Sequence, residues 1–215
     1  MEATYAALAR DLITRQAVKG GQLMVCIAGA PGSGKTTTSL RLQQLIPGSV
    51  VVPMDGYHYY RRELDEFADK AEAYARRGAP FTFNARRFVA DMRALRRDGR
   101  GSFPSFDHKI GDPSENAIEV LESHCIVICE GNYLLLEEAP WCDLLELFDH
   151  SLHVGCAEEA LLTRLVRRHM ATGLAEVEAR VRAESNDLVN ARLICGYAHR
   201  ASQIVSSVDD DTAGR

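Results

Sequence analysis

The feature that most constrains the fold is a glycine-rich segment, residues 29–36, between an apolar run and a helical pattern. Its sequence, GAPGSGKT, satisfies G-x-x-x-x-G-K-[ST], in which glycines let successive backbone N–H groups converge on phosphate oxygens. The preceding run LMVCIA is typical of a buried strand, and the helix that follows points its positive end at the same spot. The segment therefore predicts a nucleoside triphosphate site.

The residues of this phosphate loop have distinct expected tasks. Lys35 would reach the β- and γ-phosphates, and the Thr36 hydroxyl would hold Mg²⁺. The rest of the loop would surround the triphosphate, namely Gly29, Ala30, Pro31, Gly32, Ser33, Gly34 and Thr37.

Composition limits the class of protein. The chain of 215 residues is long enough for one α/β domain with a lid or an insertion, and 46% apolar residues can fill its core. With 25 basic against 30 acidic residues, it lacks the dominant basic surface that a nucleic-acid or membrane partner requires. The six cysteines form no C-x-x-C pattern, and no signal peptide or membrane-length apolar stretch is visible. We expect a soluble, cytoplasmic protein.

Strands and helices are expected to alternate. Near-continuous apolar runs at 23–28, 49–54, 125–129 and 150–155, with a possible fifth at 202–208, are typical of parallel strands covered on both faces. Helical patterns cover residues 3–17, 61–77, 84–98, 157–172 and 175–192. Residues 102–120 suggest a strand, a turn and a return strand. These patterns predict one doubly wound α/β domain over 1–215, with a mostly parallel sheet of about five strands, an insertion at about 56–120 and a helical lid at about 157–192.

Missing motifs narrow the reaction. The chain has neither the N-K-x-D guanine reader of a GTP switch nor the L-S-G-G-Q signature of a transporter ATPase. A helicase would normally need a second lobe and a basic channel. Two hypotheses remain: a small-molecule kinase, or a regulatory nucleotide-binding protein with little turnover.

Carboxylates follow two predicted strands. Asp55 ends the second strand, and because strand carboxyl ends face the ligand crevice, we expect it beside the phosphate loop, one strand away. There it could accept the proton of an attacking hydroxyl or contact the metal; its alternative role is a helix N-cap or turn former. Glu130 ends the third strand, where it could contact the metal, orient a metal-bound water, hold the acceptor, or merely cap a turn. Tyr57 and His58 are expected to line the acceptor site.

Three further groups have both a functional and a structural interpretation. Arg164 and Arg168, on the polar face of helix 157–172, are either catalytic lid arginines or part of a solvated face. Asp107 and His108 lie in a Pro- and Gly-bounded loop, where they either bind a hydroxylated acceptor or form a hairpin tip. Asn186, four residues before Asn190 on one helix face, either binds ligand or satisfies backbone groups.

Several segments occur in a characteristic order, namely GAPGSGKTT, VVPMDGYHYYRRELD, RRGAPFTFNARRF, FPSFDHKIGDP, EGNYLLL, RLVRRHMATGL and NDLVNARLI. Together they resemble the uridine kinase, phosphoribulokinase and pantothenate kinase group of phosphate-loop kinases over roughly residues 20–205. Within this group they are most similar to the bacterial uridine kinase-like branch labelled nucleoside/nucleotide kinase or fructose transport system kinase.

The resemblance implies ATP- and Mg²⁺-dependent phosphorylation of a hydroxyl on a small metabolite, and frequent homodimers. It assigns Asp55 as general base, Glu130 as the strand-end carboxylate, and Arg164 or Arg168 to the lid. Asp107 and His108 match an acceptor-contacting segment in which Phe106 replaces the usual tyrosine. The segment DGYHY also departs from the D-S-F-Y of true uridine kinases, so uridine is not assumed as the acceptor.

Overall fold

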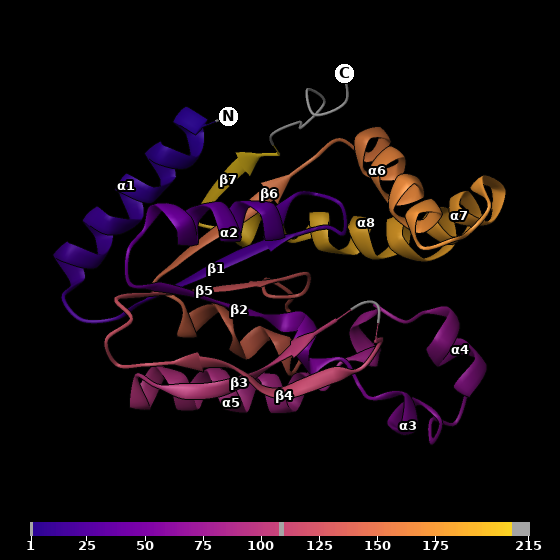
Figure 1. Cartoon of the computed structure of the whole chain (residues 1–215), viewed down its shortest axis with the longest axis horizontal. Coiled ribbons are helices and arrows are strands. Elements are labelled where there is room, and N and C mark those ends of the chain that lie inside the picture. Colours follow the sequence, from indigo (N-terminus) through magenta and orange to yellow (C-terminus); the bar gives the residue numbers. More distant parts are fainter. Residues whose placement is uncertain (1, 108–109, 208–215) are drawn as a thin grey trace.

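Five strands form one sheet at the centre of the computed structural model, which describes residues 2–107 and 110–207 (Figure 1). Every strand pair in this sheet is parallel, as the doubly wound interpretation predicted. The strand order is β2–β5–β1–β6–β7, with bounds β1 Leu23–Gly29, β2 Ser49–Pro53, β5 Ile126–Gly131, β6 His150–Gly155 and β7 Gln203–Ser206.

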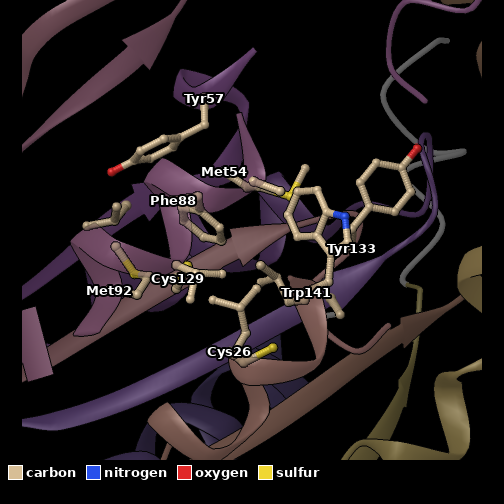
Figure 2. Packing of buried hydrophobic residues seen from close by; sticks show 14 of the residues in the cluster. Cys26, Met54, Tyr57, Phe88, Met92, Cys129, Tyr133 and Trp141 are labelled. Carbon is tan, nitrogen blue, oxygen red and sulfur yellow. The ribbon is translucent and has the colours of Figure 1, made fainter. Parts of the chain in front are cut away.

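Helices cover both faces of the sheet. On one face α1 (Glu2–Lys19) and α2 (Lys35–Leu45) share a core with Val25 and Ile27, and on the other Cys26 lies in a core with Phe88 and Met92 of α5 (Ala85–Asp98) (Figures 1 and 2). Successive β1 side chains thus enter opposite cores, which explains why the strand is apolar at every position. Among the described residues, no helix combines the length and the apolar character that crossing a bilayer requires.

The insertion contains the predicted hairpin, formed by β3 (Gly101–Phe106) and β4 (Pro113–Val120), which pair antiparallel as a separate sheet. The continuous helix predicted over 61–77 is wrong, because the structure divides it into α3 (Arg61–Leu64) and α4 (Lys70–Ala75). The Asp69 carboxylate accepts the backbone N–H of Glu72 at 2.8 Å, so this side chain starts a new helix at α4.

The predicted lid contains α6 (Glu158–Ala171), α7 (Glu176–Arg182) and α8 (Leu188–Gly196). A π-helical turn, Ala183–Asp187, joins α7 to α8, so the helix predicted over 175–192 is continuous but changes its winding. The remaining short turns are the 3₁₀ segments η1 (Met54–Tyr57), η2 (Pro80–Thr82), η3 (Trp141–Asp143), η4 (Leu145–Leu147) and η6 (Ala198–Arg200).

Candidate active site

The phosphate loop connects the end of β1 to the start of α2. Its turn depends on positive φ angles at Gly32 (80°) and Gly34 (88°), which glycine adopts without a steric penalty. A Cβ at Gly29 would lie 2.5 Å from the Ser33 hydroxyl oxygen, so the loop folds too tightly over the strand end for a larger residue. Gly34 precedes the first turn of α2 and supplies no side-chain cap, which leaves the helix's first N–H groups directed toward the loop. The loop has the geometry of an anion site.

Glu130 lies directly beside this loop because β5 is paired with β1. The Thr36 hydroxyl is 3.2 and 3.3 Å from the two Glu130 carboxylate oxygens. Glu130 is only 4% exposed, and burial raises its pKa to about 7 against the opposing positive charge of Lys35. Repulsion from Asp55 also raises this pKa, so the two carboxylates and Lys35 form one electrostatic cluster.

Asp55 reaches this cluster from η1, immediately after β2. The strand order corrects one expectation: β2 is not the neighbour of β1, because β5 lies between them. Pro53 is in register with Glu130 across the β2–β5 pair, and this register brings the two strand ends to the same edge. Glu130, at the end of β5, therefore lies between the phosphate loop and the Asp55 turn.

The donors at this edge suit Mg²⁺. The Thr36 hydroxyl and the Glu130 and Asp55 carboxylates are oxygen donors, the type that this hard cation prefers. Within residues 2–107 and 110–207, no group of three or more His, Cys, Asp or Glu side chains could hold a metal ion by itself. The donor set thus fits a cation that takes most of its ligands from phosphate oxygens and water.

The two predicted lid arginines lie in different surroundings. The Arg164 guanidinium donates to the Gly32 carbonyl at 3.0 Å and to the Ser207 hydroxyl at 2.8 Å, so it touches the phosphate loop. The Arg168 side chain is 50% exposed and pairs with Asp187 at 3.6 Å. The structure brings Arg164, and not Arg168, into contact with the loop.

Tyr57 and His58, both predicted at the acceptor side, have different surroundings. Tyr57 is 2% exposed and packs against Phe88 with ring centroids 4.8 Å apart (Figure 2). Its hydroxyl donates to Asp91 at 2.8 Å. The structure thus places the Tyr57 side chain in the core, whereas the sequence predicted it at the acceptor site. His58 remains close to the site, with Nδ1 2.8 Å from the Asp55 carbonyl oxygen.

His58 lies in an aromatic cluster that includes the predicted acceptor segment. Its ring stacks on Phe106 with centroids 4.4 Å apart and packs at a tilt of 41° against Phe83 with centroids 4.0 Å apart. This stacking brings the end of β3, and with it Asp107, next to the turn that carries Asp55. His108 lies outside the described residues.

Asn186 is 3% exposed and occupies the π-helical turn. Its Oδ1 accepts from Arg76 Nε at 2.9 Å, and its Nδ2 donates to the Arg77 carbonyl at 3.1 Å. Both polar atoms of the Asn186 amide are thus hydrogen-bonded to residues at the end of α4. The geometry therefore favours the structural interpretation of Asn186. The side chain joins the lid to the insertion.

Sequence reasoning missed Asn132 and Arg76. Asn132 is 9% exposed, and its Oδ1 has no hydrogen-bond partner in the described part of the chain, two residues beyond Glu130. Its position two residues after a strand-end carboxylate could have identified Asn132 as a candidate site residue. Arg76 begins the segment RRGAPFTFNARRF, but local spacing does not predict its contacts, because its partners Asn186 and Asn190 are more than a hundred residues away.

Comparisons with known proteins match the part of the chain that forms this site. The model of the phosphoribulokinase / uridine kinase family matches residues 24–191, which span the phosphate loop, both strand-end carboxylates and most of the lid. A fission yeast protein (Schizosaccharomyces pombe) provisionally named a uridine kinase is 38% identical over 183 residues, covering 80% of this chain and 78% of the relative.

Two other relatives carry kinase names. The ATP-dependent kinase YFH7 of Lachancea thermotolerans is 32% identical, and the match covers 87% of this chain and 66% of that protein. A solved structure from Silicibacter sp. TM1040, provisionally named a fructose transport system kinase, superposes with a TM-score of 0.85 at 34% identity. That superposition covers 94% of this chain and 98% of the other.

Proposed function

The chain belongs to the phosphoribulokinase / uridine kinase family, and from this premise we propose that it transfers the γ-phosphoryl group of ATP to a hydroxyl of a small metabolite. The observation that carries the proposal is the contact between Thr36 and Glu130 at the mouth of the phosphate loop, with Asp55 close enough to act on the Glu130 charge. A site that only bound nucleotide would not need a second carboxylate beside the phosphate loop.

The chain's own groups divide the work. The loop N–H groups, the α2 terminus and Lys35 hold the triphosphate. Thr36, Glu130 and Asp55 would hold Mg²⁺, which supplies positive charge to the β- and γ-phosphate oxygens. Arg164, already against the Gly32 carbonyl, adds positive charge from the lid side.

Asp55 performs the proton transfer. As the acceptor oxygen bonds to the γ-phosphorus, the bond from that phosphorus to the β–γ bridging oxygen breaks and ADP leaves. The acceptor hydroxyl releases its proton to the Asp55 carboxylate in the same step. The insertion at about 56–120, which carries His58 and Asp107, would hold the acceptor, and the lid at about 157–192 would close over the nucleotide.

A coupled assay of ADP release with ATP and Mg²⁺ tests the proposal against fructose and other sugars, uridine, cytidine and pantothenate. The expected result is ADP formation that one acceptor accelerates well above the background. ADP formation that no acceptor accelerates, together with tight ATP binding by calorimetry, would instead favour a regulatory or transport-accessory nucleotide-binding protein.

A further inference from the structure

Arg76 occupies the end of α4, on the insertion side of the candidate site. Its Nε donates to Asn186 Oδ1 at 2.9 Å, and its Nη2 donates to Asn190 Oδ1 at 3.4 Å. Both asparagines are at least 97% buried, with exposed fractions of 3% and 2%. The lid therefore presents a rigid amide surface that fixes the orientation of this guanidinium.

The charge of Arg76 has no carboxylate counterpart among residues 2–107 and 110–207. Its hydrogen-bond partners are neutral amides, whereas the adjacent Arg77 has Asp112 at 3.7 Å. A guanidinium carries five N–H donors, and the two amides take two of them. A partly buried cation normally pairs with an anion, and the planar guanidinium is suited to carboxylate or phosphate.

The position of Arg76 relative to the proposed base points to the acceptor. Tyr133, which follows β5, donates its hydroxyl to the Gly78 carbonyl oxygen, two residues beyond Arg76. Burial raises the pKa of this phenol, while the nearby charges of Asp55 and Arg76 shift it in opposite directions. The charges of Asp55 and Arg76 therefore both lie near the Tyr133 hydroxyl.

We propose that the acceptor of this enzyme carries an anionic group, a carboxylate or a phosphate, and that Arg76 binds it. The inference rests on the proposed kinase function and narrows its substrate class. Arg76 belongs to the insertion, whereas the triphosphate already has Lys35, the α2 terminus and Arg164, so the acceptor is the anion left for it. The asparagine pair ties this acceptor contact to the lid, since the same amides belong to the π-helical turn and α8.

Calorimetric binding tests the inference with the full-length protein, saturated with Mg²⁺ and a non-hydrolysable ATP analogue so that the phosphate loop is filled. The probes are matched pairs: glycerate and glycerol, pantothenate and panthenol, fructose 6-phosphate and fructose. We expect at least one anionic member to bind tenfold or more tightly than its neutral partner. The carboxylate and phosphate pairs then distinguish the two sources of negative charge.

The variant Arg76→Gln should remove most of this tenfold preference, and Arg76→Lys should keep part of it. Arg62→Gln is the matched control, because Arg62 lies on the same insertion with its guanidinium 4.5 Å from the Tyr60 ring, and it should leave the preference unchanged. Thermal unfolding checks that each variant is folded. The inference is overturned if no anionic member binds more tightly than its neutral partner, or if Arg76→Gln keeps the preference.

Affinity for the ATP analogue separates the acceptor from the nucleotide. Arg76→Gln should change it less than threefold, and a tenfold loss would move Arg76 to the triphosphate and overturn the assignment. The binding assay requires no turnover, so an Arg76-dependent anion preference without any acceptor-stimulated ADP release would refute the kinase function alone. Transfer to a neutral acceptor that Arg76→Gln leaves intact would refute the inference alone.

Discussion

The Thr36 hydroxyl meets both carboxylate oxygens of Glu130, at 3.2 and 3.3 Å, and this contact joins the first turn of α2 to the end of β5. Glu130 is almost fully buried there and repelled by Asp55. Burial and this repulsion both disfavour the ionised form of the Glu130 carboxyl in the folded protein. This cost can be measured.

Glu130→Gln should stabilise the ligand-free protein at alkaline pH. Between pH 4.5 and about 7 the folded carboxyl keeps a proton that the unfolded chain releases, so the free energy of unfolding of the native protein falls as pH rises through this window. Above pH 7 the loss is complete and amounts to about 3 kcal/mol, which the neutral glutamine avoids.

Urea unfolding at pH 5 and pH 8 measures this difference. The variant's advantage should be small at pH 5 and large at pH 8, while Glu119→Gln, at an exposed position on β4, should show no such trend. An advantage for Glu130→Gln that does not grow with pH would contradict the raised pKa.

The edge that carries this contact could be predicted from the sequence, because a parallel sheet places every strand's carboxyl end on one side. The apolar runs and the glycine loop thus located Lys35, Asp55 and Glu130 together. Their order across the sheet could not be predicted, since the crossover that inserts β5 between β2 and β1 depends on how helices pack rather than on local pattern.

Side-chain direction also escaped prediction. Tyr57 ends the 3₁₀ turn η1, and His58 follows it. The sequence DGYHY predicts neither this turn nor that Tyr57 packs against Phe88 while His58 packs against Phe106. The roles of Arg76 and Asn186 depend on contacts between residues 110 positions apart, for which spacing carries no signal. Local sequence motifs predicted the residues of the nucleotide side. The arrangement of the acceptor side depends on tertiary packing, which local motifs do not encode.

Asp55→Asn should separate binding from chemistry. The asparagine keeps the size of the side chain but cannot take the acceptor proton, so we expect kcat to fall by about 10²–10⁴. ATP affinity, measured by calorimetry in the presence of Mg²⁺, should change by only a few-fold. Turnover close to that of the native enzyme would exclude Asp55 as the general base.

The two lid arginines should differ in importance. Arg164→Ala removes a guanidinium that contacts the Gly32 carbonyl at 3.0 Å, and we expect a loss of about 10²-fold in kcat/KM for ATP. Arg168→Ala removes a half-exposed partner of Asp187 and should cost less than tenfold. Steady-state kinetics on both variants decides the question, and the opposite ranking would assign the lid charge to Arg168.

Tyr57→Phe should affect stability and leave catalysis unchanged. Removal of the hydroxyl that donates to Asp91 at 2.8 Å should lower the free energy of unfolding by about 1 kcal/mol. Because the ring lies in the core against Phe88, kcat and the acceptor KM should equal those of the native enzyme. A tenfold rise in the acceptor KM would instead show that the Tyr57 hydroxyl contacts the acceptor.

Gly56→Ala should disturb the position of Asp55 from the adjacent residue. A Cβ at Gly56 would lie 2.2 Å from the Pro104 carbonyl oxygen, so η1 and β3 cannot keep their present separation. Since this contact is with backbone rather than a flexible side chain, we expect a loss of about 2–3 kcal/mol in unfolding free energy and a fall in kcat as Asp55 moves.

Gly196→Ala is the control, because a Cβ there has no atom of the described residues within 4 Å and its helical position favours alanine. Chemical denaturation of both variants measures the contrast, and equal stabilities would show that the turn carrying Asp55 can shift away from β3 at no cost.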